Sequence, residues 1–96
     1  MGLYQSRFSK QFLETLQSVQ TTPLYGIFLH NLEIVEDDPS VGNEASFLDA
    51  EAGQRTYMCS DREQGQTFAL VYRWPGSCEE LGSLLFFDQL RQIVVF

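Results

Sequence analysis

Two glycine-glutamine pairs in the middle of the chain constrain its fold more than any other feature. They lie 12 residues apart, at Gly53-Gln54 and Gly65-Gln66. Glycine adopts positive φ angles without steric cost, so glycine between short β-branched and aromatic runs indicates hairpin turns. The three runs that these turns separate read SFLDA, RTYMCS and TFALVYRW. The sequence therefore predicts an antiparallel meander within residues 45–74, with turns at residues 51–54 and 62–66.

The last strand of this meander is apolar on both sides. Phe68, Leu70 and Tyr72 share one face, whereas Ala69 and Val71 share the other. A strand of this kind is covered on both faces or lies in the centre of a sheet. We therefore expect it to take a central position in the sheet.

The length and composition indicate one globular domain. Ninety-six residues support a single modest core, so we expect one domain over residues 1–96. Hydrophobic residues make up 44% of the chain, which excludes an intrinsically disordered protein. No apolar run approaches the ~20 residues that a transmembrane helix needs. The first residues do not show a basic region followed by an apolar one, so we expect no secretory signal. We expect a cytoplasmic protein in which Cys59 and Cys78 stay reduced.

One helix is expected before the meander in the chain and one after it. Apolar residues recur at helical spacing within residues 4–20, which predicts an amphipathic helix packed on the sheet. Ser77 is a suitable N-cap for a second helix over residues 78–92, and residues 93–96 are its end or a short strand. The predicted fold is a single small α+β domain with an N-terminal helix, an antiparallel β-meander sheet and a C-terminal helix.

Residues 24–35 are the most ambiguous segment. Their aromatic and β-branched content, together with Gly26, favours a strand, which is the prediction that we adopt. The alternative is a helix, with Thr22 as the N-cap, Pro23 at the first position and apolar residues along one side.

The sequence contains few residues that carry chemistry. His30 is the only histidine, and it lies in a mostly apolar run, so we expect neither Ser-His nor Cys-His catalysis. Neither cysteine has the spacing of a zinc ligand, no glycine-rich phosphate loop is present, and residues 36–44 do not match a calcium loop. The sequence therefore predicts a protein that is not an enzyme and that holds no cofactor and no metal.

Acidic residues are concentrated in one half of the chain. Residues 11–54 contain eight acidic residues and no basic one, so this stretch carries a charge of −8 against −7 for the whole chain. Such a surface argues against direct nucleic-acid binding, which requires basic residues. The acids form either a solvated loop or a docking surface that steers a basic partner. The residues expected to engage that partner are Glu36, Asp37, Asp38 and Glu44.

Two functional classes fit these features better than a small enzyme or ligand-binding domain. The first is a protein-interaction module, such as an adaptor, an assembly factor or a small subunit, that binds a basic protein partner. The second is an acidic inhibitor, of the type made by phages and mobile elements, that blocks a nucleic-acid-binding enzyme. A nucleic-acid mimic needs carboxylates spread along a long surface, whereas these acids are clustered. The clustering favours the interaction module.

The predicted second helix carries apolar side chains on two opposite sides. One sheet can cover one of these sides, which leaves three alternatives: the helix is sandwiched inside the domain, it breaks near Leu85, or its other side is buried against another molecule. We adopt the third. A homodimer and a groove on a partner are the two alternatives for that molecule. The expected contacts are Phe86, Phe87 and Leu90, because aromatic residues dominate such interfaces.

The first six residues fit the M-G-x-x-x-[ST] pattern of N-myristoylation at Gly2. This pattern fixes only two positions after Met1, so coincidental matches are common. We therefore expect no membrane association.

Overall fold

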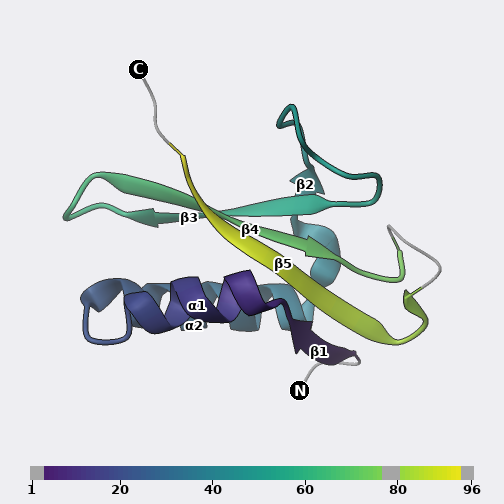
Figure 1. Cartoon of the computed structure of the whole chain (residues 1–96), viewed down its shortest axis with the longest axis horizontal. Helices are drawn as coiled ribbons and strands as arrows, with labels where there is room; N and C mark the ends of the chain where they lie inside the picture. The colour runs from purple at the N-terminus through teal and green to yellow at the C-terminus, as the bar shows by residue number, and fades with distance from the viewer. Residues whose placement is uncertain (1–3, 77–80, 94–96) are drawn as a thin grey trace.

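A five-stranded sheet with both α-helices on one side forms the fold (Figure 1). The structure is a computed structural model that describes residues 4–76 and 81–93. Its elements, in chain order, are β1 (Gln5–Phe8), α1 (Lys10–Ser18), α2 (Pro23–Asp37), the short 3-10 helix η1 (Pro39–Val41), β2 (Asn43–Glu44), β3 (Arg55–Asp61), β4 (Gln66–Arg73) and β5 (Leu84–Ile93).

The sheet is mixed, with the strand order β1-β5-β4-β3-β2. Strands β2 to β5 form an antiparallel meander, and β4 is the central strand, in agreement with its two apolar faces. The first strand adds to the outside of β5 in parallel, so the predicted all-antiparallel sheet is wrong. Parallel pairing is possible here because the helices carry the chain from β1 back across one face before the meander begins.

The predicted turn at residues 62–66 is confirmed as the β3–β4 hairpin. Asp61 Oδ1 accepts hydrogen bonds from the backbone N–H groups of Glu63 (3.1 Å) and Gln64 (3.3 Å), and Gly65 has a φ of +63°. The turn at residues 51–54 is also present, but the SFLDA segment before it is a loop. Instead, the two residues of β2 pair with the start of β3.

Residues 24–35 are helical, so the strand prediction for this segment is wrong. Helix α2 has Thr22 at its N-cap and Pro23 in its first turn, as in the alternative interpretation. The spacing of its buried residues, Phe28, Leu32 and Val35, matches the period of a helix and places all three on the sheet. This burial offsets the helix-weakening effect of the exposed Gly26.

The predicted helix over residues 4–20 is shorter than expected, because its first turn is the strand β1. Ser9 ends this strand and caps α1, with its hydroxyl accepting a hydrogen bond from Phe12 N (3.0 Å). The Ser9 N–H also donates to the carbonyl oxygen of Phe87 (2.9 Å). One serine therefore joins the parallel strand pair to the helix that follows.

No helix occupies residues 84–93, so the predicted C-terminal helix is wrong; residues 77–80 lie outside the described part. This segment is the strand β5, which has β1 on one side and β4 on the other. The two apolar sides that a helical wheel assigns to this segment are the two faces of a strand. Leu85 and Phe87 point to the helices, whereas Leu84 and Phe86 are half-buried on the opposite face.

The core lies between the sheet and the two helices. Phe87 is fully buried there, with its ring 5.3 Å from Phe8, 5.5 Å from Phe12 and 6.0 Å from Tyr72. In the part of the chain that the structure describes, no helix is long and apolar enough to cross a membrane.

Candidate functional site

The end of α2 carries a group of acidic residues. Glu33, Glu36 and Asp37 lie in its last two turns, and Asp38 is its C-cap residue. The last turn contains no basic residue. The C-terminus of a helix is the negative end of its dipole, where negative side chains are unfavourable and basic ones are preferred. Glu33 and Asp37 are also four residues apart, a spacing at which like charges repel.

Side-chain hydrogen bonds hold two of the four predicted acids. The hydroxyl of Ser6 on β1 donates to Glu36 Oε2 at 2.5 Å, and Glu36 is half-buried. Asp38 is also the N-cap of η1, and its Oδ1 accepts from the backbone N–H (3.2 Å) and the hydroxyl (2.6 Å) of Ser40. Both carboxylates therefore have fixed positions at the end of the helix.

The segment that leads from these acids to β2 is anchored to the core through Tyr72. The Tyr72 hydroxyl donates to the carbonyl oxygen of Pro39 and accepts from Gly42 N (3.0 Å). Burial raises the pKa of this hydroxyl, so it stays protonated and remains a donor. A Cβ atom at Gly42 would lie 2.3 Å from the Tyr72 oxygen, which excludes larger residues at this position.

Glu44 follows this anchored segment on the edge strand β2, where it is exposed and faces Arg55 in the register of the sheet. Figure 1 shows the chain passing from the end of α2 through the short coil of η1 to β2, from the helix layer to the sheet. The four predicted acids, Glu36, Asp37, Asp38 and Glu44, thus lie on one continuous segment, which we call the acidic segment.

Three basic side chains pair with acids outside the acidic segment, and a fourth, Arg55, lies against it. Lys10 pairs with Glu14 (3.8 Å), Arg73 with Asp88 (2.8 Å) and Arg91 with Asp49 (2.8 Å). The hydrogen bond from Arg91 lowers the pKa of Asp49. The Arg55 guanidinium donates to the carbonyl oxygen of Gly42.

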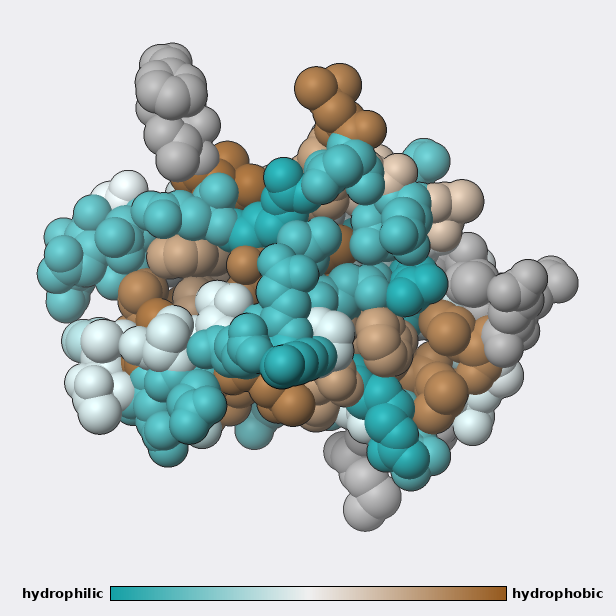
Figure 2. Space-filling view, in the orientation of Figure 1, coloured by the Kyte–Doolittle hydropathy of each residue, from teal (hydrophilic) through white to brown (hydrophobic). Residues whose placement is uncertain are grey.

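The three predicted apolar contacts do not form one surface. Phe87 and Leu90 are buried in the core. Phe86 lies on the other face of the sheet, with the Arg73 guanidinium 5.2 Å from the centre of its ring. The prediction that these residues meet another molecule depended on a helix that is absent, so we do not carry them forward as partner contacts. On the face shown in Figure 2, hydrophobic side chains form separate patches divided by hydrophilic ones.

A polar network on the outer face of the sheet was not predicted. A β-bulge in β5 places Asp88 opposite no residue of β4, because Val71 pairs with Gln89 and Tyr72 with Phe87. Arg73 donates to both oxygens of Asp88, and Gln54 Nε2 donates to Oδ2 at 3.2 Å. The sequence signal for this bulge is an aspartate within an apolar strand run.

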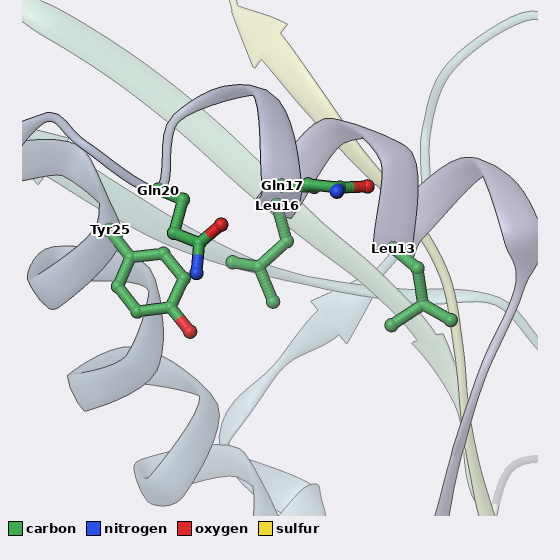
Figure 3. Close-up of a pocket in the computed structure, with 5 residues that line it drawn as sticks. All are labelled: Leu13, Leu16, Gln17, Gln20 and Tyr25. Atoms are coloured by element: carbon green, nitrogen blue, oxygen red, sulfur yellow. The ribbon is translucent and has the colours of Figure 1, made fainter.

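Two hollows lie on the described part of the surface. One of about 290 Å³ lies between α1 and α2 and is lined by Leu13, Leu16, Gln17, Gln20 and Tyr25 (Figure 3). Another of about 210 Å³ is lined by Glu44, Gly53, Gln54 and Arg55. The first contains no ionisable side chain except a tyrosine, and neither contains a histidine or a cysteine.

The structure describes the histidine and one of the two cysteines, and these two residues differ in burial. His30 is exposed on α2, whereas Cys59 is buried in the core, and burial raises the pKa of its thiol to about 12. A thiol with such a pKa is a poor nucleophile at neutral pH. Cys78 lies outside the described residues. Within residues 4–76 and 81–93, no three histidine, cysteine or carboxylate side chains are grouped closely enough to hold a metal ion.

Comparison with known proteins adds no functional assignment. No protein-family model, curated protein or solved structure matches this chain. The functional argument therefore depends on the surfaces described above, and first on the acidic segment.

Proposed function

We propose that this protein is a small non-catalytic interaction module whose acidic segment binds a partner protein with a basic surface. The observation that carries this proposal is the position of the acids at the C-terminal end of α2, with no basic residue in the last turn. Negative charge at this end of a helix interacts unfavourably with the helix dipole, by about 0.3–1 kcal/mol per side chain, and the hydrogen bonds of Glu36 and Asp38 offset part of this cost. An arrangement that lowers stability in the free protein is typical of a surface that another molecule completes.

A basic partner would reverse this unfavourable electrostatic interaction. Lysine or arginine side chains placed near the helix end interact well with both the carboxylates and the helix dipole. The anchoring of the segment through Tyr72 favours binding further, because little conformational entropy is then lost on association. The net charge of −7 would also accelerate the approach of a positively charged protein.

The test compares two triple variants that change the net charge equally. The first, Asp37→Asn/Asp38→Asn/Glu44→Gln, neutralises the acidic segment but leaves Glu36 to accept its hydrogen bond from Ser6. The second, Glu14→Gln/Asp49→Asn/Glu51→Gln, neutralises exposed acids elsewhere. Partners are captured from nuclease-treated lysate of the source cells, purified, and mixed with each protein in stopped-flow experiments at several salt concentrations.

We expect the first variant to associate about tenfold more slowly than wild type at low salt and to show a weaker salt dependence. Its thermal stability should be unchanged or slightly higher. The second variant should remain close to wild type. Equal slowing in both variants would mean that net charge alone matters, and wild-type rates in the first variant would exclude the acidic segment as the binding surface.

A further inference from the structure

One edge of the sheet is open for most of its length. Strand β2 is two residues long and pairs only with Arg55 and Thr56, at the start of β3. Among the described residues, none pairs with β3 on this side from Tyr57 to Asp61. Figure 1 shows the β3–β4 hairpin extending well beyond β2.

The register of the sheet identifies the backbone groups on this open edge. Ala45 N donates to the carbonyl oxygen of Gln54 (3.0 Å), and Asn43 is opposite Thr56. Backbone groups of alternate residues point to the same side of a strand, so the even-numbered residues point toward β2. The N–H and C=O groups of Met58 and Ser60 therefore face outward, past the end of β2.

Of the features that usually prevent strands from joining, this edge has a buried charge, Asp61, at one end, and it lacks several others. Residues 57–61 contain no proline and no lysine, and their pairing with β4 has no bulge. Their apolar content is moderate, and the Met58 side chain is 52% exposed. A strand that approaches this edge would meet regular, unobstructed backbone.

An added strand at this edge would pack against the flank of α2 that faces away from α1. Tyr25 and Glu36 face α1 and β1, because Tyr25 lines the hollow shared with α1 and Glu36 binds Ser6. At 100° per residue, Ile27 and Ile34 lie on the opposite flank, and both are half-buried. Helix α2 packs on β3. The open edge is therefore bordered by partly exposed apolar side chains that an added strand would cover.

We propose that the edge of β3 from Tyr57 to Asp61 binds an extended, basic segment of the partner as an additional strand of the sheet. This inference rests on the proposed function and specifies its binding mode. The net charge favours a basic partner over a second copy of the chain. A second copy would bring together two chains of net charge −7, and residues 56–61 carry no basic side chain to offset this repulsion. Glu44 and Glu63 border the edge together with Arg55 and Arg62, so the net charge of the whole chain, not a local charge, favours lysine or arginine in the added strand. Backbone pairing would supply affinity, as in other cases of strand addition.

The probe is a blocked ten-residue peptide of alternating lysine and valine, and its control is the same peptide with glutamate in place of lysine. Amide hydrogen exchange of the whole protein is followed by NMR. Without peptide, the amides of Met58 and Ser60 should exchange fast, and those of Tyr57 and Cys59 slowly. The lysine peptide should slow exchange at Met58 and Ser60, and the glutamate peptide should not.

Two variants at one position separate backbone pairing from side-chain contact. Met58→Pro removes an outward N–H that makes no bond to β4, and it should weaken peptide binding about tenfold or more. Met58→Ala keeps the N–H and should weaken binding less than about threefold. Melting temperatures of both variants verify that the fold is retained, and Ser60→Pro replaces Met58→Pro if that variant is unfolded.

Several results would overturn the inference. Equal losses for Met58→Pro and Met58→Ala would indicate a side-chain contact instead of strand addition. Peptide binding that leaves Met58 and Ser60 unprotected, or no binding, would exclude this edge while leaving the test of the acidic segment unaffected. Protection of these amides without peptide, together with dimer formation in light scattering, would make a second copy the occupant.

Discussion

The two faces of the sheet are stabilised by different interactions. The face toward the helices is apolar, and Phe12, Phe28 and Phe87 are fully buried between sheet and helices. The opposite face is partly covered by the loop of residues 45–54, and its main contacts are polar. There Asp88 binds Arg73 and Gln54, while Arg91 pairs with Asp49 and lies 4.2 Å from the centre of the Phe47 ring.

This difference follows from what covers each face. Two helices exclude water from the inner face and supply large apolar side chains to fill the space. One loop cannot do so, and the central strand therefore has the small residues Ala69 and Val71 on the outer face, both fully buried beneath their neighbours. Neighbouring residues of β5 show the contrast directly, since Phe87 is fully buried and Phe86 is only half-buried against Arg73.

The largest expected effect is the loss of stability on truncation of Phe87. Phe87→Ala should lower the free energy of unfolding by about 3–5 kcal/mol, because it leaves a cavity among three aromatic rings. Phe86→Ala on the outer face is the matched control, for which a loss of about 1 kcal/mol is expected. Urea unfolding measures both values, and equal losses would contradict the distinction between the faces.

The next effect is a difference in reactivity toward thiol reagents between positions 59 and 58, which lie on opposite faces of β3. In a Cys78→Ser background, Cys59 should resist thiol reagents at pH 8, because burial raises its thiol pKa from 9.0 to about 12. A cysteine introduced by Met58→Cys should react about tenfold faster or more, since this position is exposed and burial of Cys59 lowers its thiolate fraction at pH 8.

The pH dependence of stability follows from the same pKa. The folded state keeps the Cys59 proton at pH values where the unfolded chain has lost it. Its contribution is therefore complete below pH 9.0 and lost as the pH rises toward about 12. Urea unfolding of wild type and Cys59→Ala at pH 8 and at pH 10.5 isolates this contribution. Parallel stability curves for the two proteins would show that the thiol is not protected by the fold.

The smallest effect is expected for the outer-face ion pair. Asp88→Ala removes the acceptor of both Arg73 and Gln54, and we expect a loss of about 1–3 kcal/mol, since the pair is partly exposed. Arg73→Met/Asp88→Ala should lose less than Asp88→Ala alone, because no half-buried guanidinium is then left without its carboxylate. Additive losses in this cycle would mean that the two side chains do not depend on each other.

Sequence reasoning was most accurate where one local interaction decides the structure. The hairpin at residues 62–66 follows from Gly65 and from the Asp61 side chain, which both act within a few residues. The acidic segment could also be predicted from the sequence. Acids that are close in the chain stay close in space when the segment that carries them is short and anchored. Its attachment through Tyr72 and Gly42, 30 residues apart, had no local signal.

The errors occurred in segments whose apolar residues fit two periods. Residues 24–35 and 84–93 both contain apolar side chains that can be placed on a helix or on a strand. For the first, a helix lets Phe28, Leu32 and Val35 cover the sheet together. For the second, the backbone is paired on both sides, with β1 from the start of the chain and with β4.

The sequence by itself determined the turns, the central strand and the distribution of charge, because each depends on residues that are close in the chain. The tertiary structure decided which apolar segments became helix or strand, that β1 joins β5 in parallel, and that β2 leaves most of the β3 edge open. These outcomes depend on hydrogen bonds and buried contacts between residues up to about 80 positions apart, such as Gln5 and Leu84. Local propensity contributes too little free energy to select among such alternatives.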